Sequence, residues 1–383
     1  MRWKTISLSD CCDVLSGYAF KSSYFGDKGI PIARIRDVVR GYSETMYQGE
    51  YKSEYLIDNG DILIGMDGDF NLAKWKGGKA LLNQRVCKII PKAGVIDPQF
   101  LFYYLPIALQ EIWVETPFVT VKHLSVKKVN SIKVPFPPIA EQKKIAAVLE
   151  KADYFRQKSQ QMEQELNSLA QSVFLDMFGD PINNSKGWST YAFKELGELK
   201  RGKSKHRPRN DPKLLGGPYP LIQTGDVARA DNYITSFKQT YSEIGLQQSK
   251  EWDEGTLCIT IAANIADTAI LSFKACFPDS VVGFNADESI TSNVYIHHWL
   301  KQYQRVLQDL APESAQKNIN LKILEQVQIF IPPLELQREF ILKIEQIEKL
   351  KKENKLKTLE LNENFNSLMQ RAFKGELDLK DVA

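Results

Sequence analysis

The most basic stretch of the chain, residues 200–209, has the composition of a segment that binds phosphate groups. Six of its ten positions are lysine or arginine, and no acidic residue follows until Asp211. Gly202 and Pro208 shape the stretch, and cationic side chains that neutralise DNA phosphates release condensed counterions. The sequence therefore predicts a phosphate-binding loop, with a solvated charged face as the alternative. The six cations are Lys200, Arg201, Lys203, Lys205, Arg207 and Arg209.

The same stretch contains a formal nucleotide-binding P-loop pattern from Gly197 to Ser204. A working P-loop follows a buried strand and opens a helix whose N–H groups hold the phosphates. Here the preceding residues include Lys194 and Glu195, and Pro208 stands where the helix would run. We therefore expect no nucleotide site at this pattern.

Other catalytic patterns are incomplete. An adenine methyltransferase needs an acidic residue or asparagine before a Pro-Pro pair, but Pro137-Pro138 and Pro332-Pro333 follow Phe136 and Ile331. Glu141 to Lys143 has the spacing of some nucleases, yet it falls where a helix is expected to begin, and acidic residues favour that position. The sequence thus predicts a chain without catalytic residues.

Cysteine and histidine spacing indicates neither disulfides nor a metal site. The five cysteines are an odd number without a C-x-x-C pair, and the four histidines form no ligand spacing with carboxylates or thiols. We expect the chain itself to bind no metal and no cofactor. The residues are Cys11, Cys12, Cys87, Cys258 and Cys276, with His123, His206, His297 and His298.

Length and composition favour a folded protein of two or three domains. The chain has 383 residues, 43% of them apolar, and a formal net charge of +3. No stretch near 18 residues is free of charges, and the first residues lack the apolar run of a signal peptide. We therefore expect a cytoplasmic protein without a membrane segment, and any nucleic-acid binding must come from local clusters of charge.

An internal duplication organises the sequence. Pro137-Pro138-Ile139 recurs as Pro332-Pro333-Leu334, an offset of 195 residues. Near the start of each copy the offset is 185, and between these regions it is 189, where Asp37 matches Asp226. Each half therefore has the same order of parts. Further matched pairs are Gly17 with Gly202, Gly60 with Gly255, Leu105 with Leu300, Lys122 with Lys317, Gln142 with Gln337, and Phe178 with Phe373.

Each copy begins with short, turn-bounded apolar runs that predict strands, and continues into a long helix after the Pro-Pro pair. The predicted strands include residues 62–64, 86–90, 132–135, 257–261 and 327–329. We expect an α+β fold with a pseudo-twofold repeat. The predicted parts are two β-rich domains at residues 1–136 and 185–331, and two helices at residues 137–180 and 332–376.

The two helices carry apolar seams with alternating steps of three and four. Steps of this kind are typical of coiled coils. At about 1.5 Å per residue, each helix is near 60 Å long, too long to lie against one small domain. We expect the two helices to pair as an antiparallel coiled coil, with Asn354 near Ser159. The seams are Ile145, Val148, Ala152, Phe155, Ser159, Met162, Leu166, Leu169, Val173 and Asp176, and Ile344, Ile347, Lys351, Asn354, Thr358, Leu361, Phe365, Leu368 and Ala372.

With two β-rich domains, each followed by a proline-rich turn and a glutamine, the chain resembles the specificity subunit of type I restriction-modification systems. The motif residues are 137–142 and 332–337, and Leu336 replaces the first copy's glutamate. The resemblance implies a non-catalytic subunit whose target-recognition domains each read half of a bipartite site in double-stranded DNA. It implies helices that set the spacing and dock two methyltransferase subunits. Those partners would use S-adenosylmethionine, and motor-nuclease subunits would use ATP and Mg²⁺.

Further DNA-binding residues are predicted from their positions in the repeat. Lys122 and Lys317 precede the closing strands and would contact equivalent phosphates, or else be solvated. Arg34, Arg36, Gln223 and Arg229 lie around the repeated aspartates and are candidates for reading bases, because arginine pairs with guanine and glutamine with adenine. The alternative function is a coiled-coil scaffold with two ligand-binding domains and no DNA role.

Overall fold

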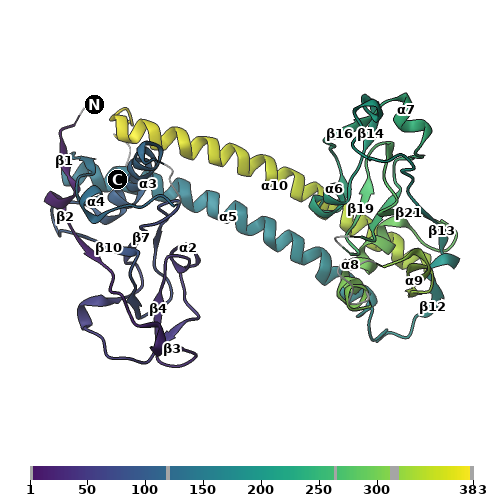
Figure 1. Ribbon diagram of the computed structural model, residues 1–383, viewed down its shortest axis with the longest axis horizontal. Coiled ribbons are helices and arrows are strands. Elements are labelled where there is room, and N and C mark those ends of the chain that lie inside the picture. Colours follow the sequence, from purple (N-terminus) through teal and green to yellow (C-terminus); the bar gives the residue numbers. More distant parts are fainter. Residues whose placement is uncertain (1–2, 118–120, 263–264, 311–318, 380–383) are drawn as a thin grey trace. The chain divides into compact units, whose positions relative to one another are not determined.

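The computed structural model describes residues 3–117, 121–262, 265–310 and 319–379. The chain divides into two compact units, one formed by residues 1–160 and 356–383 and the other by residues 161–355. Each unit combines one β-rich domain with parts of two long helices, α5 (Ile139–Phe178) and α10 (Leu334–Lys374) (Figure 1). The expected helix bounds, residues 137–180 and 332–376, differ from these by two residues at each end.

The first domain contains two small sheets and a strand pair. Four strands form an antiparallel sheet in the order β2-β10-β7-β8, and five form a sheet in the order β3-β5-β4-β9-β6, in which β4 and β9 are parallel. Its strands are β1 (Thr5–Ser7), β2 (Cys12–Ser16), β3 (Phe25–Gly26), β4 (Ile30–Ala33), β5 (Met46–Tyr47), β6 (Leu56–Ile57), β7 (Ile62–Gly65), β8 (Leu72–Lys74), β9 (Ala80–Leu82), β10 (Val86–Pro91) and β11 (Lys133–Pro135). Its helices are α1 (Leu8–Cys11), α2 (Asp37–Arg40), α3 (Pro98–Glu115) and α4 (Val126–Asn130).

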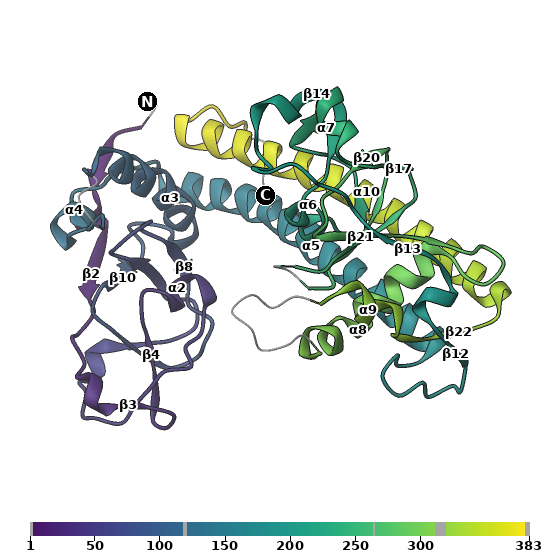
Figure 2. The same ribbon diagram turned by 45° about the vertical axis from the view of Figure 1, so that its right-hand side comes forward.

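The second domain repeats this plan. Its five-stranded sheet has the order β13-β21-β18-β19-β15, and a further sheet joins β16, β14, β20 and β17, the last three of which lie together in Figure 2. The strands are β12 (Ser189–Ala192), β13 (Gly197–Arg201), β14 (Leu215–Leu221), β15 (Tyr233–Ile234), β16 (Gln239–Tyr241), β17 (Glu251–Trp252), β18 (Leu257–Thr260), β19 (Thr268–Leu271), β20 (Ala275–Cys276), β21 (Val281–Ala286) and β22 (Gln328–Ile331). The helices are α6 (Thr224–Arg229), α7 (Glu243–Gln247), α8 (Asn293–Asp309) and α9 (Leu321–Glu325).

Equivalent backbone contacts confirm the predicted repeat. The N–H of Gly17 donates to the carbonyl of Val86 over 2.9 Å, and the N–H of Gly202 donates to that of Val281 over 2.8 Å. At both glycines an added Cβ would overlap a backbone carbonyl, that of Asn83 in the first domain and that of Pro278 in the second. Only glycine allows this close approach. The two glycines are 185 residues apart, and the two valines that accept from them are 195 residues apart. Regions with different offsets therefore contact each other at the same structural junction in each copy.

Each domain packs its core against the long helices of its own unit. In the first unit, α3 residues such as Phe100 and Leu105 lie in one apolar cluster with Ile145, Leu149 and Phe373. In the second unit the buried Trp299 of α8 belongs to a cluster with Phe174, Phe178 and Phe340, which Leu166 and Ile344 extend. The core thus joins domain to helix in both units, and the predicted α+β class is confirmed.

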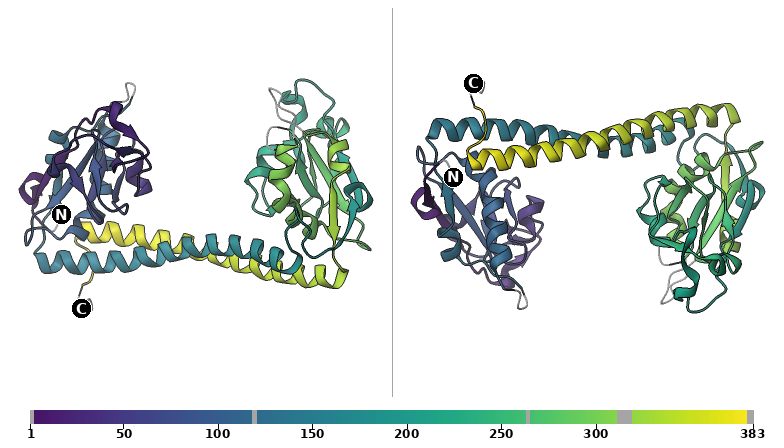
Figure 3. Two further views of the ribbon diagram at one scale, coloured as in Figure 1. Left: turned by 90° about the horizontal axis from the view of Figure 1, so that it is seen from below. Right: turned by 90° about the horizontal axis from the view of Figure 1, so that it is seen from above.

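Within each unit the parts of α5 and α10 lie side by side, as Figure 3 shows beside the first domain. Ser159 and Thr358 share a hydrogen bond of 2.7 Å in the first unit, and the rings of Phe174 and Phe340 are 5.6 Å apart in the second. We expected Asn354 to lie near Ser159; the observed partner, Thr358, is four residues further along α10. The knobs-into-holes packing of a coiled coil stays a prediction.

The predicted apolar seam of α5 is partly wrong. Phe155, Met162 and Leu169 are 44–48% exposed, whereas Leu149 and Ala170 take buried positions. The cause is that apolar residues occupy adjacent positions along α5, so steps of three and four fit two neighbouring stripes equally well. In α10, by contrast, the predicted residues Ile344, Ile347, Phe365 and Ala372 are buried. None of the helices in the described ranges is long and apolar enough to cross a membrane.

Candidate nucleic-acid interface

The basic stretch begins on an edge strand of the second domain and continues as a loop. Gly197–Arg201 is β13, which pairs antiparallel with β21, and the chain then leaves the sheet at Gly202. No helix opens within residues 202–211. The P-loop pattern therefore lacks the strand-to-helix turn that would hold phosphates.

Asp279, on the loop between β20 and β21, collects three of the predicted arginines. Arg201 donates to its backbone carbonyl through Nε (2.9 Å) and Nη2 (2.6 Å), Arg207 Nη2 lies 3.5 Å from Oδ2, and Arg209 pairs with Oδ1. All three side chains remain exposed. Asp279 thus gathers three guanidinium groups at one place, two through its carboxylate, which offsets part of their charge, and one through its backbone carbonyl.

The three lysines of the stretch behave differently from one another. Lys200 forms an ion pair with Glu198, whose pKa is lowered by that hydrogen bond. Lys203 and Lys205 are exposed, and neither ammonium has a hydrogen bond or ion pair with a described residue. Beside them, the pKa of Asp211 is lowered, first by the backbone N–H of Lys213 and then by His206. Lys203 and Lys205 are therefore the cations of the loop that the protein itself leaves available.

Lys122 is placed differently from either interpretation of the sequence. Its side chain is buried at 8% exposure, its ammonium lies 3.5 Å from the centroid of the Trp113 ring, and it donates to the Trp113 carbonyl. A phosphate contact would require breaking this cation–π contact. The structure thus gives Lys122 a packing role. Its counterpart Lys317 lies outside the described residues.

The four predicted base-reading residues sit at two equivalent short helices. Asp37 accepts from the N–H of Arg34 over 3.1 Å at α2, and Asp226 accepts from the N–H of Gln223 over 2.9 Å at α6. The repeated aspartates therefore fix the two helix starts. The side chains of Arg36 and Arg229 are 60% and 59% exposed, and each pairs with the aspartate of its own helix, Asp37 over 3.7 Å and Asp226 over 2.6 Å.

The glutamines of the two proline motifs are buried, and each connects a long helix to its own domain through hydrogen bonds. From the sequence they were expected only to lie at the helix starts. We call these two residues the glutamine locks. Gln142 accepts from the N–H of Asp97 over 2.8 Å and donates to the carbonyl of Pro137 over 2.9 Å. Gln337 accepts from the hydroxyl of Thr291 over 2.9 Å and donates to the carbonyl of Pro332 over 2.9 Å. Each glutamine is at most 1% exposed. The repeated spacing was the signal that could have revealed this role.

We expect Gln142→Ala to destabilise the first unit by about 2–4 kcal/mol, because the N–H of Asp97 and the carbonyl of Pro137 lose a buried partner. Thermal unfolding followed by circular dichroism would measure the change. Gln164→Ala, at an exposed position of the same helix, is the matched control and should leave the melting temperature nearly unchanged. Equal melting temperatures for the two variants would contradict the locking role.

Both halves of the chain, residues 1–168 and 185–361, match the family described as the type I restriction modification DNA specificity domain. The chain belongs to this family. The type I restriction enzyme EcoBI specificity subunit of Escherichia coli is 28% identical over 409 residues, covering 98% of this chain and 86% of the relative. A putative specificity subunit of the type I restriction enzyme MjaX from Methanocaldococcus jannaschii is 22% identical, and the match covers 99% of this chain and 94% of that relative.

Solved structures of specificity subunits have the same fold. The S subunit of a type I restriction-modification system from M. genitalium superposes with a TM-score of 0.60 at 13% identity, over 97% of this chain and 96% of that one. A chain from a structural study of complex assembly in a type I system gives a TM-score of 0.58 at 18% identity, over 98% of each chain. The family match and the curated relatives favour DNA specificity over a scaffold without a DNA role.

All five cysteines and two of the four histidines of this specificity subunit are buried. Burial raises the pKa of Cys87 to about 12 and lowers that of His298 to about 3, so each holds its neutral form at neutral pH. His297 is fully buried and hydrogen-bonded to Thr268 and Asn232. In the described ranges, no group of three or more His, Cys, Asp or Glu residues could hold a metal ion.

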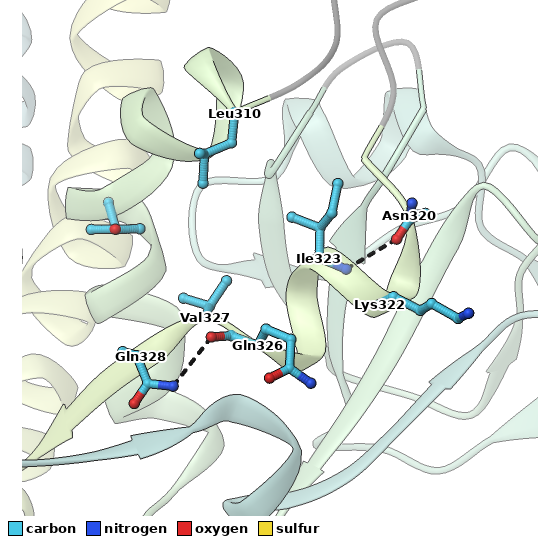
Figure 4. A pocket seen from close by; sticks show the side chains of 8 residues that line it. Leu310, Asn320, Lys322, Ile323, Gln326, Val327 and Gln328 are labelled. Carbon is cyan, nitrogen blue, oxygen red and sulfur yellow. Dashed lines mark hydrogen bonds between the residues drawn. The ribbon is translucent and has the colours of Figure 1, made fainter.

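One surface cavity of the second domain has a described lining without carboxylate, histidine or thiol groups. It has a volume of about 530 Å³ and lies between the end of α8 and the start of β22 (Figure 4). Its described lining contains no carboxylate, histidine or thiol: Tyr303, Leu310, Asn320, Lys322, Ile323, Gln326, Val327 and Gln328. The cavity therefore offers an apolar and amide surface with one lysine and one tyrosine, and its described lining holds no carboxylate or thiol.

Proposed function

We propose that this specificity subunit reads a bipartite site in double-stranded DNA, with one half-site for each domain, and directs adenine methylation there by two partner subunits. The observation that carries the proposal is the duplicated junction at Gly17 and Gly202, where one backbone frame bears different side chains. Residues 200–209 make this surface strongly basic in the second domain, whereas residues 16–21 leave it weakly basic in the first. Two copies of one frame with unlike surfaces suit two unlike half-sites.

The partner subunits would dock on the long helices. In α5 the residues Tyr154, Phe155, Met162 and Leu169, three of them expected in the seam, are instead 44–54% exposed, and in α10 Leu342, Leu350, Leu356 and Leu359 are 50–60% exposed. Exposed apolar side chains repeated along a helix are typical of interaction surfaces. We infer that methyltransferase subunits cover these positions, and that motor-nuclease subunits join where the system also cleaves DNA.

The chemistry would reside in the partners. Within the described residues of this chain, the P-loop pattern is a strand and a loop, and no cluster suits a metal. S-adenosylmethionine would therefore bind to the methyltransferase subunits, and ATP and Mg²⁺ to the motor-nuclease subunits. This subunit would supply position and sequence choice, and those are binding functions.

Genome-wide mapping of methylated adenines with and without the gene tests the proposal. We expect one bipartite motif, with an unread spacer between its halves, to lose methylation on deletion and to regain it when the gene is restored. A strain in which Gln164→Ala replaces the natural residue is the control and should keep the motif. An unchanged methylation map after deletion would show that the chain does not direct methylation.

A further inference from the structure

Three segments of the first domain meet at a surface that carries Arg85. The N–H of Met66 donates to the carbonyl of Arg85 over 2.8 Å, and the N–H of Leu124 donates to that of Met66 over 2.7 Å. The N–H of Gly68 also donates to the carbonyl of Lys122 over 3.0 Å. These main-chain bonds fix the loop of Arg85 against the segments that carry Asp67 and His123. Lys122, which precedes His123 in the chain, is buried and anchors the His123 segment through its contact with Trp113.

The same frame exists in the second domain without the same side chains. The N–H of Ile261 donates to the carbonyl of Ser280, and the N–H of Ile319 donates to that of Ile261, each over 3.0 Å. These bonds are displaced by 195 residues from their counterparts in the first domain. At that offset Arg85 corresponds to Ser280 and Asp67 corresponds to Ala262. A conserved backbone with changed polar side chains is what two domains with different target sequences require.

Arg85 is held from one side and open on the other. His123 Nδ1 lies 2.6 Å from Asp67 Oδ1, and because a carboxylate only accepts, His123 is the donor. Asp67 Oδ2 lies 3.5 Å from Arg85 Nε. A protonated Nδ1 cannot accept from Arg85 Nη1, although the two atoms are 3.3 Å apart. Both Nη groups therefore have no acceptor among the described residues, and the side chain is 56% exposed.

The loop of Arg85 adjoins the junction that the second domain uses for its basic stretch. The N–H of Tyr18 donates to the carbonyl of Leu82 over 3.0 Å, and the N–H of Gln84 donates to that of Tyr18 over 2.8 Å. In the second domain the equivalent loop carries Asp279, which gathers Arg201, Arg207 and Arg209. The repeat thus places Arg85 at the position in its domain where the other domain concentrates its cations.

We propose that Arg85 is a specificity-determining residue of the first domain and that its Nη groups donate to O6 and N7 of a guanine in the first half-site. Asp67 and His123 would act as positioning residues that orient the guanidinium. The proposal rests on the proposed function and deepens it by naming a base and its reader. Paired donors in the fixed fork of an arginine match the two major-groove acceptors of guanine, whereas a lysine provides a single flexible ammonium.

The test uses the assembled complex of this subunit with its methyltransferase partners and a DNA library randomised at both half-sites. We expect the wild-type complex to require guanine at one position of one half-site. Arg85→Ala and Arg85→Lys should each lower that preference roughly 10- to 100-fold. Asp67→Asn should lower it by a smaller factor, and every variant should leave the other half-site unchanged. Arg305→Lys, the same exchange at an exposed arginine of α8, is the control and should keep all preferences.

Two results would overturn the role of Arg85. One is an unchanged guanine preference in Arg85→Lys with uniformly weaker binding in Arg85→Ala, which would identify a phosphate contact. The other is an unchanged preference in both variants. Thermal unfolding of each variant excludes a folding defect as the cause of a lost preference. Methylation without any sequence preference by the wild-type complex would instead contradict the proposed function itself.

Discussion

Removing one heptad from each long helix is expected to move the preferred DNA site to a spacer about three base pairs shorter. The deletion removes residues 157–163 from α5 and residues 352–358 from α10, so the hydrogen-bonded pair Ser159 and Thr358 leaves together. Seven residues at about 1.5 Å each shorten a helix by roughly 10 Å, close to the rise of three base pairs. Because both helices run from one unit into the other, their length should set the spacing of the half-sites.

A series of DNA duplexes with the same half-sites and varied spacers would measure this shift through methylation by the assembled complex. Three base pairs also rotate the second half-site by roughly 100°, which DNA twist or domain tilt has to absorb. A deletion in α5 alone is the matched control, because it breaks the pairing and should abolish methylation at every spacer. A folded double deletion that retains the original spacer optimum would show that the helices do not set the spacing.

Replacing the cations of the basic loop should weaken binding to all DNA sequences and reduce its salt dependence. Lys203→Ala with Lys205→Ala removes the two ammonium groups that have no partner among the described residues, and adding Arg207→Ala and Arg209→Ala removes two guanidinium groups held at Asp279. The slope of log affinity against log salt is negative, and each lost phosphate contact reduces its magnitude by about 0.9. The fourfold variant should therefore show a slope smaller in magnitude by about 3.6. It should also bind DNA roughly 100- to 1,000-fold more weakly near 0.15 M salt.

Titration of labelled duplexes over a range of salt concentrations measures both quantities. The control is Lys194→Ala with Lys238→Ala, at exposed positions elsewhere in the second domain. It removes two positive charges, as many as Lys203→Ala with Lys205→Ala. We expect this control to keep the natural slope. A fourfold variant with an unchanged slope would identify residues 200–209 as a solvated face.

Local patterns in the sequence were sufficient to predict several strands, both long helices and the repeat, but not the domain helices α3 and α8. Strands such as β7 and β10 and both long helices follow from short-range periodicity and from proline at the helix starts. The repeat supplied the pairing of equivalent positions, including Gly17 with Gly202 and Asp37 with Asp226. The strands and helix starts depend on neighbours along the chain, and the repeat appears when the sequence is compared with itself, so one sequence is enough to predict both.

Interactions between distant segments could not be predicted in the same way. Asp279 lies 70 residues beyond Arg209 in the chain, so the sequence around the basic stretch gives no sign of this acceptor. Lys122 was expected to be exposed, and nothing local distinguishes a solvated lysine from one that packs on the ring of Trp113. The trio of Asp67, Arg85 and His123 comes from three separate segments, and only the fold brings them together.

The two glutamine locks have a consequence for how such proteins diversify. Of their bonds to the domains and the proline turns, all but the one to the Thr291 hydroxyl go to main-chain atoms, such as the N–H of Asp97 and the carbonyl of Ile290. A main-chain atom is present whatever side chain stands at its position. Mutation or recombination can therefore replace most of a domain's side chains, and with them its target, while the attachment to the helix is inherited intact.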